Sequence, residues 1–98
     1  MEEITQRPTE APAPNVIGQT HEMNGQQYIF RPARVEELDR YLSKASKGLV
    51  TASIVLAIDM AQEADRAELG ALFQAQPGLA VRVANDELAA RGFGTGQD

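Results

Sequence analysis

The chain has 98 residues, a formal net charge of −5 and no cysteine. This length supports one domain, and the lack of cysteine excludes disulfides and thiolate nucleophiles. One histidine, His21, is too few for the usual zinc sites, and the acidic balance argues against DNA or RNA, whose phosphates are bound mainly by Lys and Arg. We therefore expect a protein that is not an enzyme, with no catalytic residue, cofactor, metal site or nucleic-acid partner.

The two ends of the chain are too polar to belong to a packed core. Residues 1–15 carry three prolines, three acidic side chains and little apolar surface, so we predict a flexible arm. The glycine-rich residues 93–98 predict a flexible tail, which leaves residues 16–92 as the domain. The arm lacks the basic start and apolar run of a secretory signal, and no stretch approaches a membrane span. We expect a protein of the bacterial cytoplasm, with no membrane contact.

The pair Asn24–Gly25 predicts a β-hairpin, because both residues accept the positive φ of a tight turn. A two-residue turn fixes the register, so the expected facing pairs are Met23 with Gln26, His21 with Tyr28 and Gln19 with Phe30. One face would carry Ile17, Met23, Tyr28 and Phe30. The other would carry Thr20, Glu22, Gln27, Ile29 and Arg31. Such a ribbon is marginal alone, so we expect it to pack on helices or on another subunit.

A first helix is predicted over about residues 34–43, after Pro32. The residues expected to face the core recur at helical spacing and are Val35, Leu38, Tyr41 and Leu42. Those expected to face water are Glu36, Glu37, Asp39 and Arg40. Glu36 and Glu37 also lie in the first turn, where the helix dipole favours negative charge.

Residues 49–62 predict a second helix that is apolar nearly all round. Val50, Ile54 and Ile58 lie on one side of it, and Leu56 and Met60 on another. The β-branched run makes a strand over 53–58 conceivable, although length and flanking alanines favour a helix. Two interpretations of the apolar excess stay open. The helix is central to its own four-helix cluster, or the domain completes its burial by oligomerising or by binding another chain.

Two further helices complete the domain. One is predicted over about 65–74, with Asp65 as N-cap and with Leu69, Leu72 and Phe73 inward. Pro77 suits the first turn of the last helix, which uses Leu79, Val83, Ala84 and Leu88 and ends near Gly92. The expected fold class is α+β, mainly α, with an N-terminal two-stranded hairpin followed by about four short helices.

Several polar residues are candidates for chemical sites. His21 with Ser43, Ser46 or Ser53 could form a base and nucleophile, but a strand histidine opposite Tyr28 is more often a packing partner. Carboxylates at Glu36 and Glu37, or at Asp59, Glu63 and Asp65, are better explained as a solvated helix face and helix caps. Asp59 is the one acid inside an apolar run, so it should have a polar partner.

Residues 23–42, "MNGQQYIFRPARVEELDRYL", resemble the start of one group of phage tail assembly chaperones, whose "NGk-Y-F-PT" ribbon leads into a helix. The matching residues are Asn24, Gly25, Tyr28, Phe30, Pro32 and the helix tyrosine Tyr41. Residues 65–88 are similar to the family's acidic helix start, leucine stripe, "PG" break and closing helix. Ala33 departs from the family's threonine, which removes an N-cap hydroxyl worth about 1 kcal/mol.

The resemblance implies a prophage or phage protein that binds the tape measure protein during tail assembly and is absent from the mature virion. The implied partner-contact or packing residues are Tyr28, Phe30, Leu38, Tyr41, Ile54 and Ile58. A homo-oligomer is also possible. The alternatives are a small structural virion subunit, from the tail or the head-joining region, and a bacterial protein-interaction adaptor.

Overall fold

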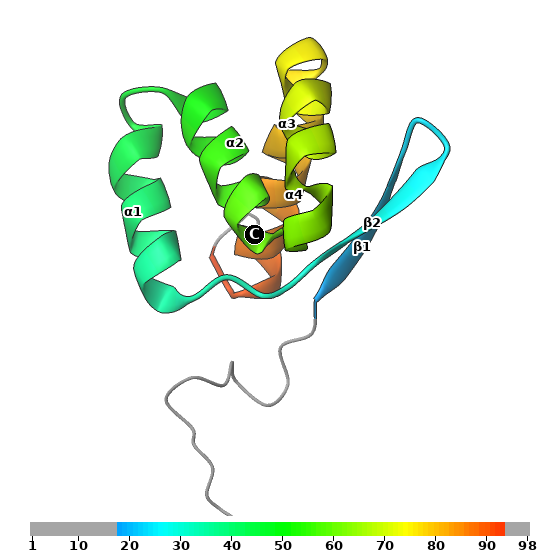
Figure 1. The fold of residues 1–98 in the computed structure, drawn as a ribbon. Coiled ribbons are helices and arrows are strands. Elements are labelled where there is room, and N and C mark those ends of the chain that lie inside the picture. The colour runs from blue at the N-terminus through cyan, green and yellow to red at the C-terminus, as the bar shows by residue number, and fades with distance from the viewer. Residues whose placement is uncertain (1–17, 94–98) are drawn as a thin grey trace, which may run out of the picture.

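The computed structural model describes residues 18–93 as a two-stranded antiparallel hairpin followed by four α-helices (Figure 1). The elements are β1 Gln19–Met23, β2 Gln26–Phe30, α1 Val35–Ala45, α2 Leu49–Met60, the short 3₁₀ helix η2 Glu63–Asp65, α3 Arg66–Ala75 and α4 Pro77–Ala90. The predicted α+β, mainly α class is therefore confirmed. The predicted arm, Ile17 and residues 94–98 of the predicted tail lie outside the described residues.

The hairpin forms where the turn chemistry predicts it. Asn24 has φ 53° and Gly25 has φ 82°, which are the left-handed conformations that a two-residue turn of this kind requires. The register is the predicted one, with Gln19 facing Phe30, His21 facing Tyr28 and Met23 facing Gln26. A slip by one residue would bring the polar face onto the core, so the apolar face and the turn enforce the same pairing.

One face of the hairpin is buried and the other is exposed. Met23, Tyr28 and Phe30 are at most 3% exposed, whereas Ile29 on the opposite face is 50% exposed. The buried face packs on this chain's own helices, as the bond from the Tyr28 hydroxyl to Glu68 of α3 shows. The hairpin therefore docks without a second subunit.

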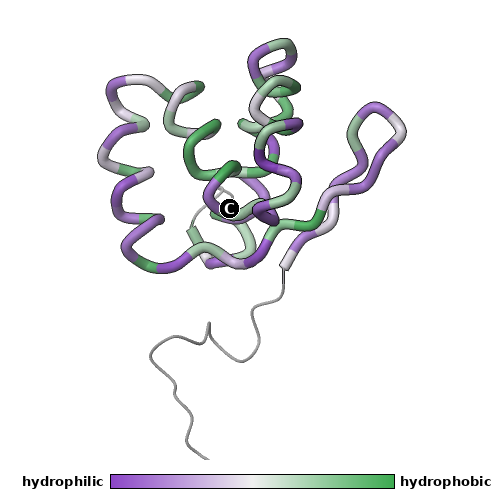
Figure 2. The backbone as a smooth tube through the Cα atoms, in the orientation of Figure 1, coloured by the Kyte–Doolittle hydropathy of each residue, from purple (hydrophilic) through white to green (hydrophobic). Residues whose placement is uncertain are grey.

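The second helix, α2, lies at the centre of the helical part, with α1 on one side and α3 and α4 on the other (Figure 1). Its most extensive contact is with α4, and Ala57 of α2 and Ala80 and Ala84 of α4 are fully buried in the shared core. Small side chains let two helix backbones approach closely, and the largest buried side chains of the same core are Phe30 and Phe73. Figure 2 shows the hydrophobic residues gathered in α2, while α1 is mostly hydrophilic. The strand considered for residues 53–58 is wrong, because the whole stretch is helical.

The predicted faces of α1 need correction. Val35 is 71% exposed and Leu42 is 43% exposed, although both were expected to face the core. Glu37, expected to face water, is only 8% exposed. The reason is that α1 packs mainly against α2, so only a narrow stripe around Leu38 and Tyr41 is covered.

The C-terminal end of α2 also differs from the prediction. The helix ends at Met60 rather than at residue 62. Ala61 has extended dihedrals and forms an isolated antiparallel bridge with Phe30, so the second strand of the hairpin meets the chain again just after α2. Asp65 occupies the N-cap position of α3 but makes no side-chain capping bond, because η2 already leads into the helix.

Candidate binding surface

The segment that joins the hairpin to α1 is held by a bidentate ion pair. The Arg31 guanidinium donates hydrogen bonds to both carboxylate oxygens of Glu37, at 2.9 and 2.8 Å, and a third to the backbone oxygen of Asp59, at 2.8 Å. The Arg34 amide donates to the same carboxylate at 2.8 Å. The bonds from Arg31 and then from the Arg34 amide lower the pKa of Glu37 to about 2. Arg31 thus ties the hairpin to α1 and to the end of α2.

A second acid, Glu87 of α4, is completely buried beneath the same segment. Its carboxylate accepts hydrogen bonds from the Gln19 side chain at 2.8 Å, from the Ala33 amide at 2.9 Å and from Arg91 at 3.1 Å. Arg91 also donates to the Ala33 carbonyl at 2.6 Å. The backbone of Ala33 is therefore bonded through its amide to α4 and through its carbonyl group to Arg91, the residue that follows α4. We interpret the cluster as a structural clamp, because its polar groups bond to one another.

The polar side chains of the hairpin are held in a similar way. His21 Nε2 lies 2.6 Å from Gln19 Oε1 and 3.8 Å from Asp86, and burial lowers its pKa. The Tyr28 hydroxyl donates to Glu68 at 2.6 Å, which raises the pKa of Tyr28 to about 12. These two side chains face each other across the strands. The rings of His21 and Tyr28 are therefore buried in the protein, while their polar atoms bond to neighbouring side chains.

Ser53 and Asp59, two of the residues considered as chemical sites, lie next to polar side chains with structural roles. Ser53 is buried with its hydroxyl 3.4 Å from that of Tyr41. Asp59 has the polar partner that its apolar surroundings require, since Arg40 lies 3.7 Å from its carboxylate. Within residues 18–93, no cluster of three or more His, Asp or Glu side chains is placed to hold a metal ion. No helix of that part is long and apolar enough to span a bilayer.

Large apolar side chains remain exposed around the turn between α1 and α2. Leu42, Leu49 and Val50 are 43–47% exposed and lie within a few residues of this turn. We call these three residues the turn-end surface. Three exposed aliphatic side chains close to one turn make this surface a candidate for binding another molecule.

A groove lies where the end of α1, the turn and the first half of α2 meet. It encloses about 420 Å³, and its lining consists of Lys44, Lys47, Gly48, Thr51, Ala52 and Val55. We call it the α1–α2 groove. A smaller hollow of about 20 Å³ continues it towards Asp59 and shares Lys44, Ala52 and Val55 with it. That hollow has room for one water molecule, so the open groove is the only one of the two that could take a larger partner.

The six residues predicted for partner contact or packing lie mostly inside the protein. Tyr28, Phe30, Leu38 and Tyr41 are at most 5% exposed. Ile54 and Ile58 are half-buried on α2 and pack against the core. None of the six belongs to the turn-end surface or lines the α1–α2 groove.

The exposed residues that do form these surfaces were missed by sequence reasoning. Leu42 was assigned to the core, and Val55 and the two lysines were not singled out. The all-round apolar pattern of residues 49–62 does signal an excess of apolar surface. It cannot show which side stays uncovered, because that depends on how α1 and α4 pack around α2.

Residues 2–97 match the family described as Domain of unknown function (DUF6848). No curated protein and no solved structure matches the chain. Since the family match spans nearly all of the 98 residues, the protein belongs to the DUF6848 family.

Proposed function

We propose that the protein is a non-catalytic tail assembly chaperone of a phage or prophage, which binds the tape measure protein before the tail tube forms around it. The observation that carries the proposal is the turn-end surface, where Leu42, Leu49 and Val50 remain exposed on a small acidic protein. Exposed aliphatic side chains at the end of a helical hairpin suit an apolar stripe on a partner helix. The resemblance of residues 23–42 to such chaperones supports the same function.

The polar clusters support this proposal in a different way. Arg31, Glu37, Glu87 and Arg91 use their bonding groups on one another and on the backbone. They stabilise the angle between the hairpin and the helices. Because these polar groups stabilise the fold, they keep the exposed apolar side chains in a fixed position for binding. The expected site of action is the host cytoplasm.

The test is co-expression with the longest helical protein encoded beside the gene. We expect soluble co-purification of that protein with the wild type and its loss in the double variant Leu49→Asp/Val50→Asp. Both positions are about half exposed, so circular dichroism and thermal melting should show an intact fold. Val35→Asp is a control for an acidic residue at an exposed apolar position away from this turn, because Val35 is 71% exposed and lies at the other end of α1.

Two results would contradict the proposal. The neighbouring protein could stay insoluble with the wild type, or it could co-purify equally with the double variant. Detection of the protein in purified mature particles, by mass spectrometry, would instead favour a structural tail or head-joining subunit. A chaperone should be absent from those particles.

A further inference from the structure

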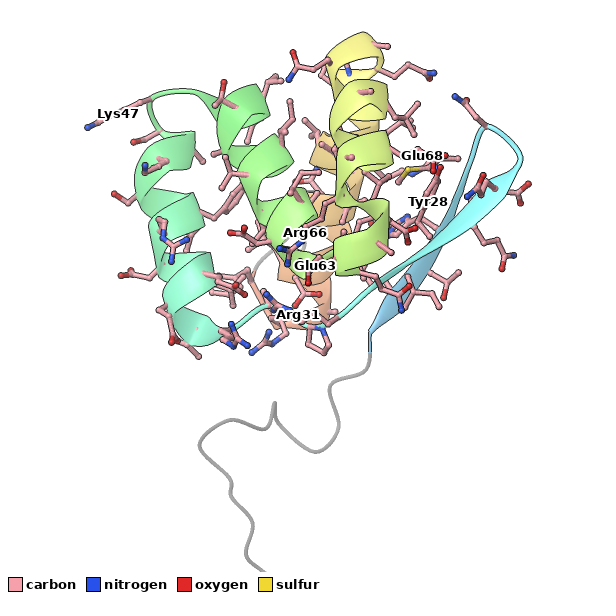
Figure 3. The ribbon with its side chains drawn as sticks, in the orientation of Figure 1. Tyr28, Arg31, Lys47, Glu63, Arg66 and Glu68 are labelled. Atoms are coloured by element: carbon pink, nitrogen blue, oxygen red, sulfur yellow. The ribbon has the colours of Figure 1, made fainter. Side chains whose placement is uncertain are left out.

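The α1–α2 groove differs in charge from the rest of the chain. The protein carries a net charge of −5, yet Lys44 and Lys47 line the groove, and Arg40 lines the adjoining small hollow. Arg40 and Lys44 are one helical turn apart on α1, and Lys47 follows in the turn. Figure 3 shows Lys47 at the outer end of the molecule, extending away from the fold. A basic edge on an acidic protein points to an acidic partner at this place.

The two lysines are not neutralised by the part of the chain that the structure describes. Arg31, Arg34 and Arg91 form ion pairs with Glu37 or Glu87, and Arg40 pairs with Asp59. By contrast, neither Lys44 nor Lys47 has a carboxylate of residues 18–93 within ion-pairing distance. Their ammonium groups can therefore bind carboxylates of a partner without breaking these internal pairs.

The floor and the opposite wall of the groove are mainly apolar. Ala52 is buried and small, and Val55 is 45% exposed beside it. A small residue on the floor allows another chain to approach closely, and Val55 offers a contact for an aliphatic side chain. The lining runs from the last turn of α1 through the turn to Val55 of α2, so the groove suits one or two turns of a partner helix.

We infer that the α1–α2 groove binds an amphipathic helix that places leucine-like side chains on Ala52 and Val55 and acidic side chains beside Lys44 and Lys47. The inference rests on the proposed function, because it names the chemistry of the client segment. The ion pairs lie at a solvated rim, so they contribute little affinity each and mainly set specificity and orientation.

The test uses two designed fluorescent peptides of about 20 residues. Both carry leucines along one helical face, and the leucines are flanked by glutamates in one peptide and by lysines in its twin. We expect fluorescence anisotropy to show that the wild type binds the glutamate peptide about tenfold more tightly at low salt, with the difference shrinking as salt rises. Lys44→Glu/Lys47→Glu should lose or reverse this preference.

A charge-matched control separates the groove from the net charge. Arg66→Glu/Arg82→Glu changes the formal charge by the same amount at exposed positions on α3 and α4, so it should keep the preference of the wild type. Val55→Asp should weaken binding of the glutamate peptide while leaving the circular dichroism spectrum unchanged. Equal binding of both peptides by the wild type, or an equal loss in the control variant, would overturn the inference.

The failure of this inference can be told apart from the failure of the proposed function. If the client co-purifies with the wild type but neither peptide binds, the groove inference is wrong and the proposed function stands. If the glutamate peptide binds through Lys44 and Lys47 but no client is solubilised, the proposed function is wrong. If light scattering shows a dimer that Lys44→Glu/Lys47→Glu disrupts, a second copy fills the groove and the inference is overturned.

Discussion

Glu37 and Glu87 show how single residues depart from a helical pattern. A charged residue on an amphipathic helix is normally assigned to water, yet both of these are buried. Each is compensated by an arginine, Arg31 for Glu37 and Arg91 for Glu87. The Glu87–Arg91 spacing of four residues was a visible signal for a pair. The Arg31–Glu37 pair has no such signal. Pro32 separates the strand from the helix, and no regular repeat of residues determines the path of the chain there.

The low pKa of Glu37 makes the stability of the protein depend on pH. The pKa is about 2 in the folded chain against an ordinary value of 4.5, so the ionised form is stabilised by folding. This contribution is complete above pH 4.5 and is lost as the pH falls from 4.5 towards 2. We expect it to be on the order of 2 kcal/mol, after allowance for the solvent that reaches Arg31.

Urea unfolding at pH 7 and at pH 3 measures this effect. In Glu37→Gln the stability at pH 7 should fall, and the loss between the two pH values should be smaller than in the wild type. Glu36→Gln changes an exposed acid in the same turn and serves as the control. A wild type and a Glu37→Gln variant with parallel pH profiles would contradict the assignment.

Removal of the Glu87 carboxylate should destabilise the fold strongly. Glu87→Ala leaves the Ala33 amide without its buried acceptor and Arg91 without its carboxylate partner, so we expect the free energy of unfolding to drop by about 3 kcal/mol. Glu87→Gln keeps one acceptor oxygen and should cost less. Chemical denaturation measures both changes, and exposed Asn85→Ala should stay within about 0.5 kcal/mol of the wild type. Equal effects of Asn85→Ala and Glu87→Ala would contradict the clamp.

At the scale of elements, the contact between α2 and α4 depends on small side chains. Ala57 of α2 and Ala80 and Ala84 of α4 are fully buried in the core that these helices share. Ala84→Leu would force a larger side chain into this contact and should lower the free energy of unfolding by about 1–3 kcal/mol. Ala89→Leu adds the same group at an exposed position of α4 and should change little. A stability loss of the same size in both variants, by thermal or chemical unfolding, would argue against close packing there.

The elements that could be predicted are those specified by neighbouring residues. Asn24–Gly25 and the alternating strands determine the hairpin and its register, and Pro77 marks the start of α4. The faces of α1 could not be predicted, because its apolar stripe includes Val35 and Leu42, which no neighbouring helix covers. The exposed residues of the candidate surface were missed for the same reason. A helical period shows that a side is apolar and leaves open whether another element reaches it.

In the molecule as a whole, α1 is the least enclosed helix. It packs mainly against α2, whereas α2 is flanked by α1, α3 and α4. Local opening of α1 should therefore require less free energy than global unfolding. Hydrogen exchange followed by NMR should show amides of α1 exchanging about tenfold or more faster than buried amides of α4, with α2 closer to α4. Uniform protection across the four helices would contradict this expectation.

The two lysines of the groove have a practical consequence, since the full sequence contains no lysine other than Lys44 and Lys47. Reagents that acylate primary amines can therefore modify side chains only at the groove, apart from an α-amino group. A fluorophore or a bifunctional succinimidyl ester attached in this way would report on one location without any engineered residue. Protection of these amines from acylation would show that a partner covers α1 and α2 in the native protein. The peptide recovered in a covalent cross-link would identify that partner.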